Sequence, residues 1–234
     1  MGTVFSIVAD VGGGVPAAVA RLHAIDAKFS TYRPDSAISR MARGERVAYD
    51  EEVAEVLERC ADVEADTGGA FSARPDGRLD PSGWVKGWAI EEVSRLLAEA
   101  GSESHLVVGG GDVQARGEPE AGRPWTVGIA DPLEPGRFAA LVSARDFAVA
   151  TSGGAERGDH ILDPATGAPA VGFASVTLIG ERIAYTDAYA TAVFAMGPER
   201  GLDWVEKREG FEAYAVLPGG HTMETAGFAR YLTG

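Results

Sequence analysis

The stretch SVTLIGERIAYTDAYATAVFAM, residues 175–196, is the most informative about the fold. Four of its first five residues are apolar or β-branched, which predicts a strand over residues 175–179. Its second half is rich in alanine, which predicts a helix over residues 187–196. A strand therefore leads directly into an apolar helix.

Along the rest of the chain, we expect strands and helices to follow one another without regular alternation. This order favours an α+β fold on a mostly antiparallel sheet packed with helices over a doubly wound parallel sheet. Asp50 is the expected N-cap of one helix and Gly101 the expected end of another. The predicted strands are residues 1–10, 106–108, 125–129, 139–142, 147–151, 175–179, 212–217 and 228–232, and the predicted helices are 16–28, 50–65, 86–100, 187–196 and 201–207.

The composition argues against several classes of protein. The chain has 234 residues, with 35 acidic against 21 basic side chains and a formal charge of −14, which disfavours nucleic acids and anionic lipids as partners. Its one cysteine, Cys60, excludes an internal disulfide and is interpreted as a core residue. Without a signal peptide or membrane segment, we expect residues 1–234 to form a single cytoplasmic domain, the alternative being an anchor lost ahead of residue 1.

The predicted helix at residues 187–196 carries a possible metal site. Asp187 and Thr191 are four residues apart, so they share one face of a helix, and hard oxygen ligands of this kind suit Mg²⁺. The alternative is structural: Thr186 is the expected N-cap, and Asp187 is then an ordinary acidic residue in the first turn.

Two glycine-containing segments are less specific. The segment LDPSGWVKG, residues 79–87, places Lys86 ahead of a predicted helix, where it could hold a phosphate, although Asp-Pro-Ser-Gly is also a common turn sequence. The segment LVVGGGDV, residues 106–113, does not continue as a dinucleotide-binding motif, so its glycines are better explained by close backbone approach.

Two further side chains could take part in chemistry. His160 lies between a polar loop and apolar residues, where it could act as a general base near neutral pH, although such a histidine is more often structural. Tyr32 could cover a planar ring, although an aromatic residue near a turn usually only packs.

Taken together, the motifs resemble those of the ApbE family, the FAD:protein FMN transferases. The resemblance extends over essentially the whole chain and in family order. It rests on MGT at residues 1–3, FSTYRPDSAISR at 29–40, GAF at 69–71, LDPSGWVKGWA at 79–89, GGD at 110–112, ATSG and HILDPATG at 150–167, and SVT and TDAYATA at 175–192.

This resemblance implies a T-fold-like α+β architecture, FAD as donor substrate, Mg²⁺, and a Thr or Ser hydroxyl of a partner flavoprotein as acceptor. It implies that Gly83, through its backbone carbonyl, holds the metal together with Asp187 and Thr191. His160 corresponds to the histidine that deprotonates the acceptor. The implied FAD site comprises Met1, Tyr32, Ala70, Phe71, Ser72, Asp80, Lys86 and Ile161.

The chain departs from the family pattern at Ala42, Ser72 and Ser82. Two alternatives therefore stay open beside FMN transfer to protein. One is an FAD pyrophosphatase that releases FMN and AMP, and the other is a flavin-binding protein without turnover.

Overall fold

The computed structural model of the protein describes residues 2–154 and 168–233. Its main sheet has seven strands in the order β1-β2-β3-β6-β7-β8-β9, and every neighbouring pair is antiparallel. The predicted α+β class with a mostly antiparallel sheet is therefore confirmed. The strands of this sheet are β1 (Phe5–Ala9), β2 (His105–Gly109), β3 (Asp112–Arg116), β6 (Phe147–Gly153), β7 (Ser175–Gly180), β8 (Glu212–Val216) and β9 (Thr222–Glu224).

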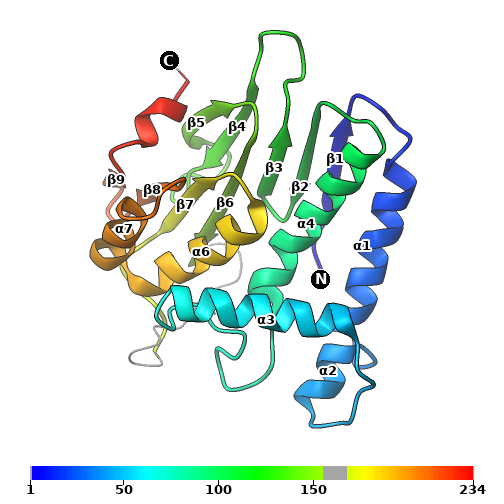
Figure 1. The fold of residues 1–234 in the computed structure, drawn as a ribbon. Helices are drawn as coiled ribbons and strands as arrows, with labels where there is room; N and C mark the ends of the chain where they lie inside the picture. The colour runs from blue at the N-terminus through cyan, green and yellow to red at the C-terminus, as the bar shows by residue number, and fades with distance from the viewer. Residues whose placement is uncertain (1, 155–167, 234) are drawn as a thin grey trace.

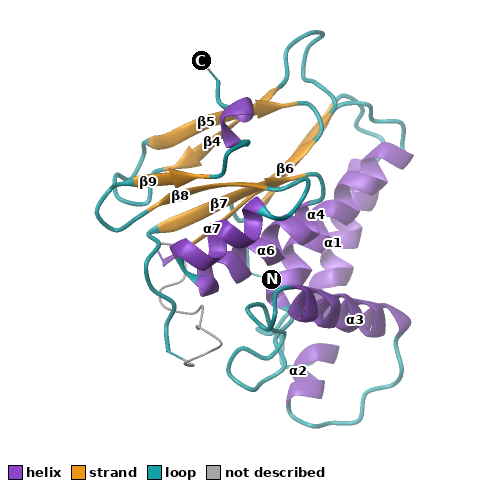
Figure 2. Cartoon of the chain, turned by 60° about the vertical axis from the view of Figure 1, so that its left-hand side comes forward, coloured by secondary structure: helices purple, strands orange, loops and turns teal. Residues whose placement is uncertain are grey.

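Helices cover one face of this sheet, and a two-stranded sheet covers part of the other (Figures 1 and 2). The helices are α1 (Val15–Phe29), α2 (Ala37–Ala42), α3 (Glu51–Asp66), α4 (Ser82–Glu99), α6 (Ile183–Met196) and α7 (Pro198–Glu206). The small sheet pairs β4 (Trp125–Ala130) with β5 (Phe138–Ala144). Two apolar cores result, one on each face of the main sheet.

The central strands β6 and β7 are buried on both faces. Ala148, Ala150 and Leu178 contribute to the core beneath the helices, whereas Val149 and Ile179 contribute to the core beneath the small sheet. A strand covered on both faces has a nearly continuous apolar sequence, so these segments do not alternate strictly between apolar and polar residues.

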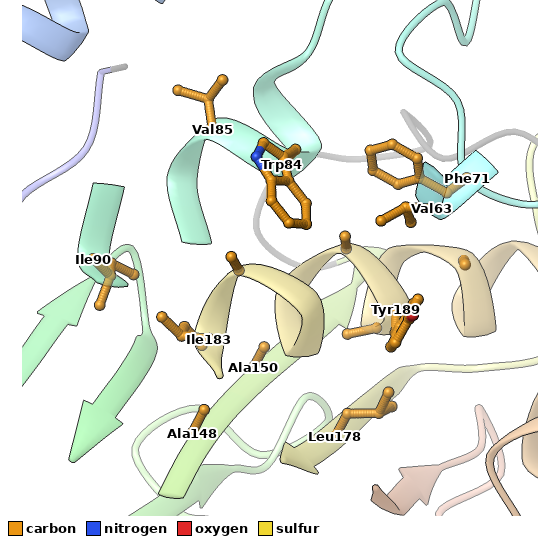
Figure 3. Packing of buried hydrophobic residues seen from close by; sticks show 14 of the residues in the cluster. Val63, Phe71, Trp84, Val85, Ile90, Ala148, Ala150, Leu178, Ile183 and Tyr189 are labelled. Atoms are coloured by element: carbon orange, nitrogen blue, oxygen red, sulfur yellow. The ribbon is translucent and has the colours of Figure 1, made fainter. Parts of the chain in front are cut away.

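Helix α6 lies between the main sheet and the residues around α4 (Figure 3). Ala148 and Ala150 lie on the sheet side of this helix, and Trp84 and Phe71 lie on the opposite side (Figure 3). Because α6 is enclosed by neighbours, nearly all its side chains are buried, as expected of a helix that is apolar all round.

Two predicted helix starts were wrong by four residues. Helix α4 begins at Ser82 and not at Lys86, because Pro81 takes the N-cap position and Asp80 accepts a hydrogen bond from the Ser82 N–H. Helix α6 begins at Ile183, so Thr186 is not its N-cap. The Thr186 hydroxyl instead donates to the Arg182 carbonyl, a bond made within the first turn.

The predicted C-terminal strand at residues 228–232 was also wrong, since residues Phe228–Tyr231 form a 3-10 helix, η1. The Phe228 N–H donates to the Thr225 carbonyl, and the Phe228 ring stacks on Tyr214. A short apolar run can bury its side chains in either conformation, so its periodicity alone does not distinguish them.

Other local predictions were confirmed. Asp50 caps α3 by accepting the N–H groups of Glu52 and Val53, and Gly101 follows α4 with a φ of +92°. Cys60 is buried in the core, and burial raises the pKa of its thiol to about 12. Among the helices of the described residues, none is long and apolar enough to cross a membrane.

His105, at the start of β2, is a buried structural histidine. Its Nε2 lies 2.7 Å from the Ser94 hydroxyl, and its Nδ1 lies 3.1 Å from the Ser102 hydroxyl. Burial, with a smaller contribution from the positive charge of Arg116, lowers the pKa of His105 below its usual value of 6.5. The folded protein therefore favours the neutral ring.

This burial predicts a loss of stability in mild acid. Below about pH 6.5 the unfolded chain takes up a proton at His105 that the folded chain resists, so the free energy of unfolding should fall by up to about 1.4 kcal/mol per pH unit. We expect His105→Gln to lose less stability than the parent protein when urea unfolding is compared at pH 7.5 and 5.5. An equal loss in both proteins would contradict the assignment.

Candidate functional site

Three charged side chains from three elements meet in the interior of the protein. Lys86 comes from α4, Asp112 from the start of β3 and Asp187 from α6. The Lys86 ammonium pairs with Oδ2 of Asp112 and lies 3.3 Å from Oδ1 of Asp187. We call these three residues the Lys86 cluster. When both carboxylates are ionised, the single ammonium leaves one negative charge in the cluster without a partner cation.

The environment of the cluster favours cations. Burial, followed by the nearby negative charge of Asp112, raises the pKa of Asp187, although Lys86 opposes this rise. Burial lowers the pKa of Lys86, but attraction to Asp187 and Asp112 outweighs it, so the net shift is upward and Lys86 stays an ammonium. A buried carboxylate of this kind is stabilised by any further positive charge placed beside it.

Backbone groups fix the orientation of both carboxylates. Oδ2 of Asp187 accepts the Gly87 N–H at 3.0 Å, and Oδ1 of Asp112 accepts the Thr151 N–H at 3.0 Å. Gly87 is four residues after Gly83, so its N–H is the donor that an α-helix directs to the Gly83 carbonyl. Because the same N–H donates to Asp187, the Asp187 carboxylate lies near the first turns of α4, where Gly83 is located.

The close approach of α4 and α6 depends on Gly87. A Cβ atom at this position would lie 2.7 Å from the Ile183 carbonyl oxygen and 3.0 Å from both the Ala184 Cα and the Asp187 Cβ. These atoms belong to the buried start of α6 and have little room to move. Glycine is therefore required for Asp187 to reach the Gly87 N–H.

The glycines at residues 109–111 form a tight hairpin between β2 and β3. Gly110 and Gly111 have φ values of +59° and +88°, the left-handed pair that a two-residue type I′ turn requires. A Cβ on Gly110 would lie 2.8 Å from the Thr3 hydroxyl and 3.6 Å from Cδ of Lys86. The turn thus places Asp112 directly beside Lys86, which explains these glycines by close approach.

The predicted metal ligands lie on α4 and α6, two helices that pack against each other at Gly87. Thr191 is half-buried and lies one turn after Asp187, and Gly83 is in the first turn of α4, packed against the Phe71 ring. Within residues 2–154 and 168–233, no group of three or more His, Cys, Asp and Glu side chains is arranged to hold a metal ion. A metal at this place would therefore need hydroxyl and carbonyl ligands beside Asp187, a set of oxygens that fits Mg²⁺.

The predicted FAD residues differ in their surroundings. The Tyr32 side chain is 75% exposed and lies beside Gly2, so its ring is available to a ligand. Phe71 is 1% exposed and its ring is part of the core, whereas the Ser72 hydroxyl is half-buried and accepts the Arg74 N–H. Ala70 is buried beside Phe71 in the sequence, and Asp80 accepts the Ser82 N–H just before α4.

Asp112 is the member of the cluster that was not predicted as a site residue. The sequence feature that could have identified it is its position: a charged residue directly after a glycine turn, followed by apolar or uncharged residues. The predicted site residues Met1, His160 and Ile161 lie outside the described residues.

Comparisons with known proteins agree with the resemblance seen in the motifs. A family model described as the ApbE family matches residues 1–74 and 72–215. An FAD:protein FMN transferase from Escherichia coli (strain K12) is 31% identical over 161 residues, which are 64% of this chain and 46% of that protein. One from Treponema pallidum is 34% identical over 168 residues, with the same two shares. The chain spans about half the length of these curated relatives.

The fold is also that of a solved structure, the apbe protein from Thermotoga maritima. The two structures superpose with a TM-score of 0.85 at 24% sequence identity, and the match covers 99% of this chain and 96% of that one. At 24% identity this structural similarity establishes the fold alone.

Proposed function

Since the chain belongs to the ApbE family, we propose that it is an Mg²⁺-dependent FAD:protein FMN transferase. In this reaction the oxygen of an acceptor Thr or Ser hydroxyl bonds to the FMN-side phosphorus of FAD. The bond from that phosphorus to the bridging oxygen breaks, AMP leaves with the bridging oxygen, and the hydroxyl proton passes to a base.

The observation that carries this proposal is the uncompensated negative charge of the Lys86 cluster. An FAD pyrophosphate is itself anionic, so two buried carboxylates beside one ammonium would repel it. Asp187 would hold a divalent cation, which would remove this repulsion and neutralise charge at the pyrophosphate oxygens when bound. The geometry therefore supports a site for the metal and a phosphate together.

We assign the metal ligands to Asp187, the Thr191 hydroxyl and the Gly83 carbonyl. Asp187 is pre-oriented by the Gly87 N–H, so its remaining oxygen lone pairs keep a constant direction. Lys86 is the ammonium nearest to this carboxylate that the structure describes, which suits it to contact a substrate phosphate bound at the metal.

The flavin contacts belong to the same proposal. The exposed ring of Tyr32 offers a flat apolar surface to the flavin, and Ala70, Ser72 and Asp80 lie on the chain that leads into α4. We also assign flavin contacts to Met1 and Ile161. His160 is assigned as the base that accepts the hydroxyl proton, and this role stays a prediction from the sequence.

The test is to mix the protein with FAD, MgCl₂ and a flavoprotein domain that carries an Asp-Gly-x-Thr/Ser-Gly-Ala-Thr type of acceptor motif. We expect flavin fluorescence that remains on the acceptor band in a denaturing gel, and AMP in equal amount by HPLC. EDTA should abolish both signals. An acceptor with its Thr or Ser changed to Ala is the matched control.

The outcomes separate the three candidate functions. AMP and free FMN without a labelled acceptor would identify a pyrophosphatase, whereas intact FAD in a tight complex would identify a flavin-binding protein. Either result, obtained across several acceptors, would overturn the proposed transfer reaction.

A further inference from the structure

We propose that Asp112 is a positioning residue that holds the Lys86 ammonium and thereby leaves Asp187 available to Mg²⁺. This inference rests on the proposed function, because it concerns the metal carboxylate of the same site. Asp112 itself is not assigned as a ligand of the metal or as a contact of FAD.

The geometry places Lys86 between two competing carboxylates. Its Nζ contacts Oδ2 of Asp112 more closely than it approaches Oδ1 of Asp187, which is 3.3 Å away. The other oxygen of Asp187 accepts the Gly87 N–H, so Oδ1 is the oxygen that Lys86 and a metal would share. A closer pairing of Lys86 with Oδ1 would therefore oppose metal binding through like-charge repulsion.

Asp112 is well built to prevent that closer pairing. Its side chain is 1% exposed, it directly follows the two-residue turn at Gly110 and Gly111, and its Oδ1 accepts the Thr151 N–H from the neighbouring strand β6. The carboxylate is thus held by the main sheet, whereas Lys86 comes from a helix and has a flexible side chain. The fixed Asp112 carboxylate therefore determines the position of the Lys86 ammonium.

The substitution Asp112→Asn tests this role with little change of shape. The asparagine Oδ1 can still accept the Thr151 N–H, but the charge that holds Lys86 is lost, and Lys86 should then pair fully with Asp187. We expect the dissociation constant for Mg²⁺, measured by calorimetry with MgCl₂ alone, to rise about 10- to 100-fold, as when outer partners of metal ligands are removed.

The double variant Lys86→Gln/Asp112→Asn separates positioning from a merely structural role. If Asp112 acts through Lys86, removal of Lys86 should return the Mg²⁺ affinity of the double variant to that of Lys86→Gln alone. Asp146→Asn is the matched control, because Asp146 also uses Oδ1 to accept a backbone N–H, from Gly117, but is exposed. This control should bind Mg²⁺ as the parent protein does.

Unchanged Mg²⁺ affinity in Asp112→Asn would overturn the inference, as would a double variant that binds no better than Asp112→Asn. These results are independent of FMN transfer by the parent protein. If the parent protein transfers FMN but the double variant does not regain Mg²⁺ affinity, only the role of Asp112 is refuted. If the double variant regains Mg²⁺ affinity but the parent protein never transfers FMN, only the proposed reaction is refuted.

Discussion

Replacing Asp187 with asparagine should lower kcat for FMN transfer about a thousandfold, because a bound metal contributes several kcal/mol to charge stabilisation in the transition state. Asparagine has the shape of aspartate and can still accept the Gly87 N–H, so the fold should be retained. The measurement is the rate of acceptor labelling at saturating FAD over a range of MgCl₂ concentrations, with circular dichroism to confirm folding.

The surface substitution Asp203→Asn is the control for Asp187→Asn. Asp203 also lies in a helix, where it pairs with Lys207 four residues later, but its side chain is 63% exposed. It should leave the rate unchanged. Activity of Asp187→Asn within about threefold of the parent, a difference under 1 kcal/mol, would remove Asp187 from the metal site.

The second large effect is expected at Gly87. The substitution Gly87→Ala adds a methyl group 2.7 Å from the Ile183 carbonyl oxygen, where neither helix can yield without disturbing the core. Overpacking of this kind costs about 1–3 kcal/mol, and the better helix propensity of alanine offsets about 1 kcal/mol at most. We expect a net loss of about 1 kcal/mol, and of up to about 2 kcal/mol, in the free energy of unfolding by urea.

The Gly87→Ala variant should also lose activity while it remains folded, because the added methyl group pushes α6 away and moves Asp187 from the Gly87 N–H. A displacement of about 1 Å at a reacting group can cost about a hundredfold in rate. The control is Gly13→Ala, since a Cβ at the exposed Gly13 meets no atom within 4 Å. Equal stability of the Gly87 and Gly13 variants would show that α4 and α6 can separate at little cost.

Features that depend on neighbours along the chain could be predicted from the sequence alone. Asp50 as a cap, the stop at Gly101 and the apolar character of residues 187–196 were readable because capping and periodicity are local. The spacing of Asp187 and Thr191 on one helical face was readable for the same reason. The family followed from the order of motifs along the chain, which needs no coordinates.

The assembly of the site could not be predicted from the sequence, because it depends on contacts between distant parts of the chain. Residues Lys86, Asp112 and Asp187 are far apart in sequence, and their meeting depends on a glycine between two helices and on a hairpin turn. Long-range ion pairs of this kind leave no periodic pattern. The true start of α6 was missed because the burial of Ile183, which depends on contacts between elements, outweighed the local signal at Thr186. The start of α4 depends instead on Pro81 and Asp80, which are local signals in the sequence.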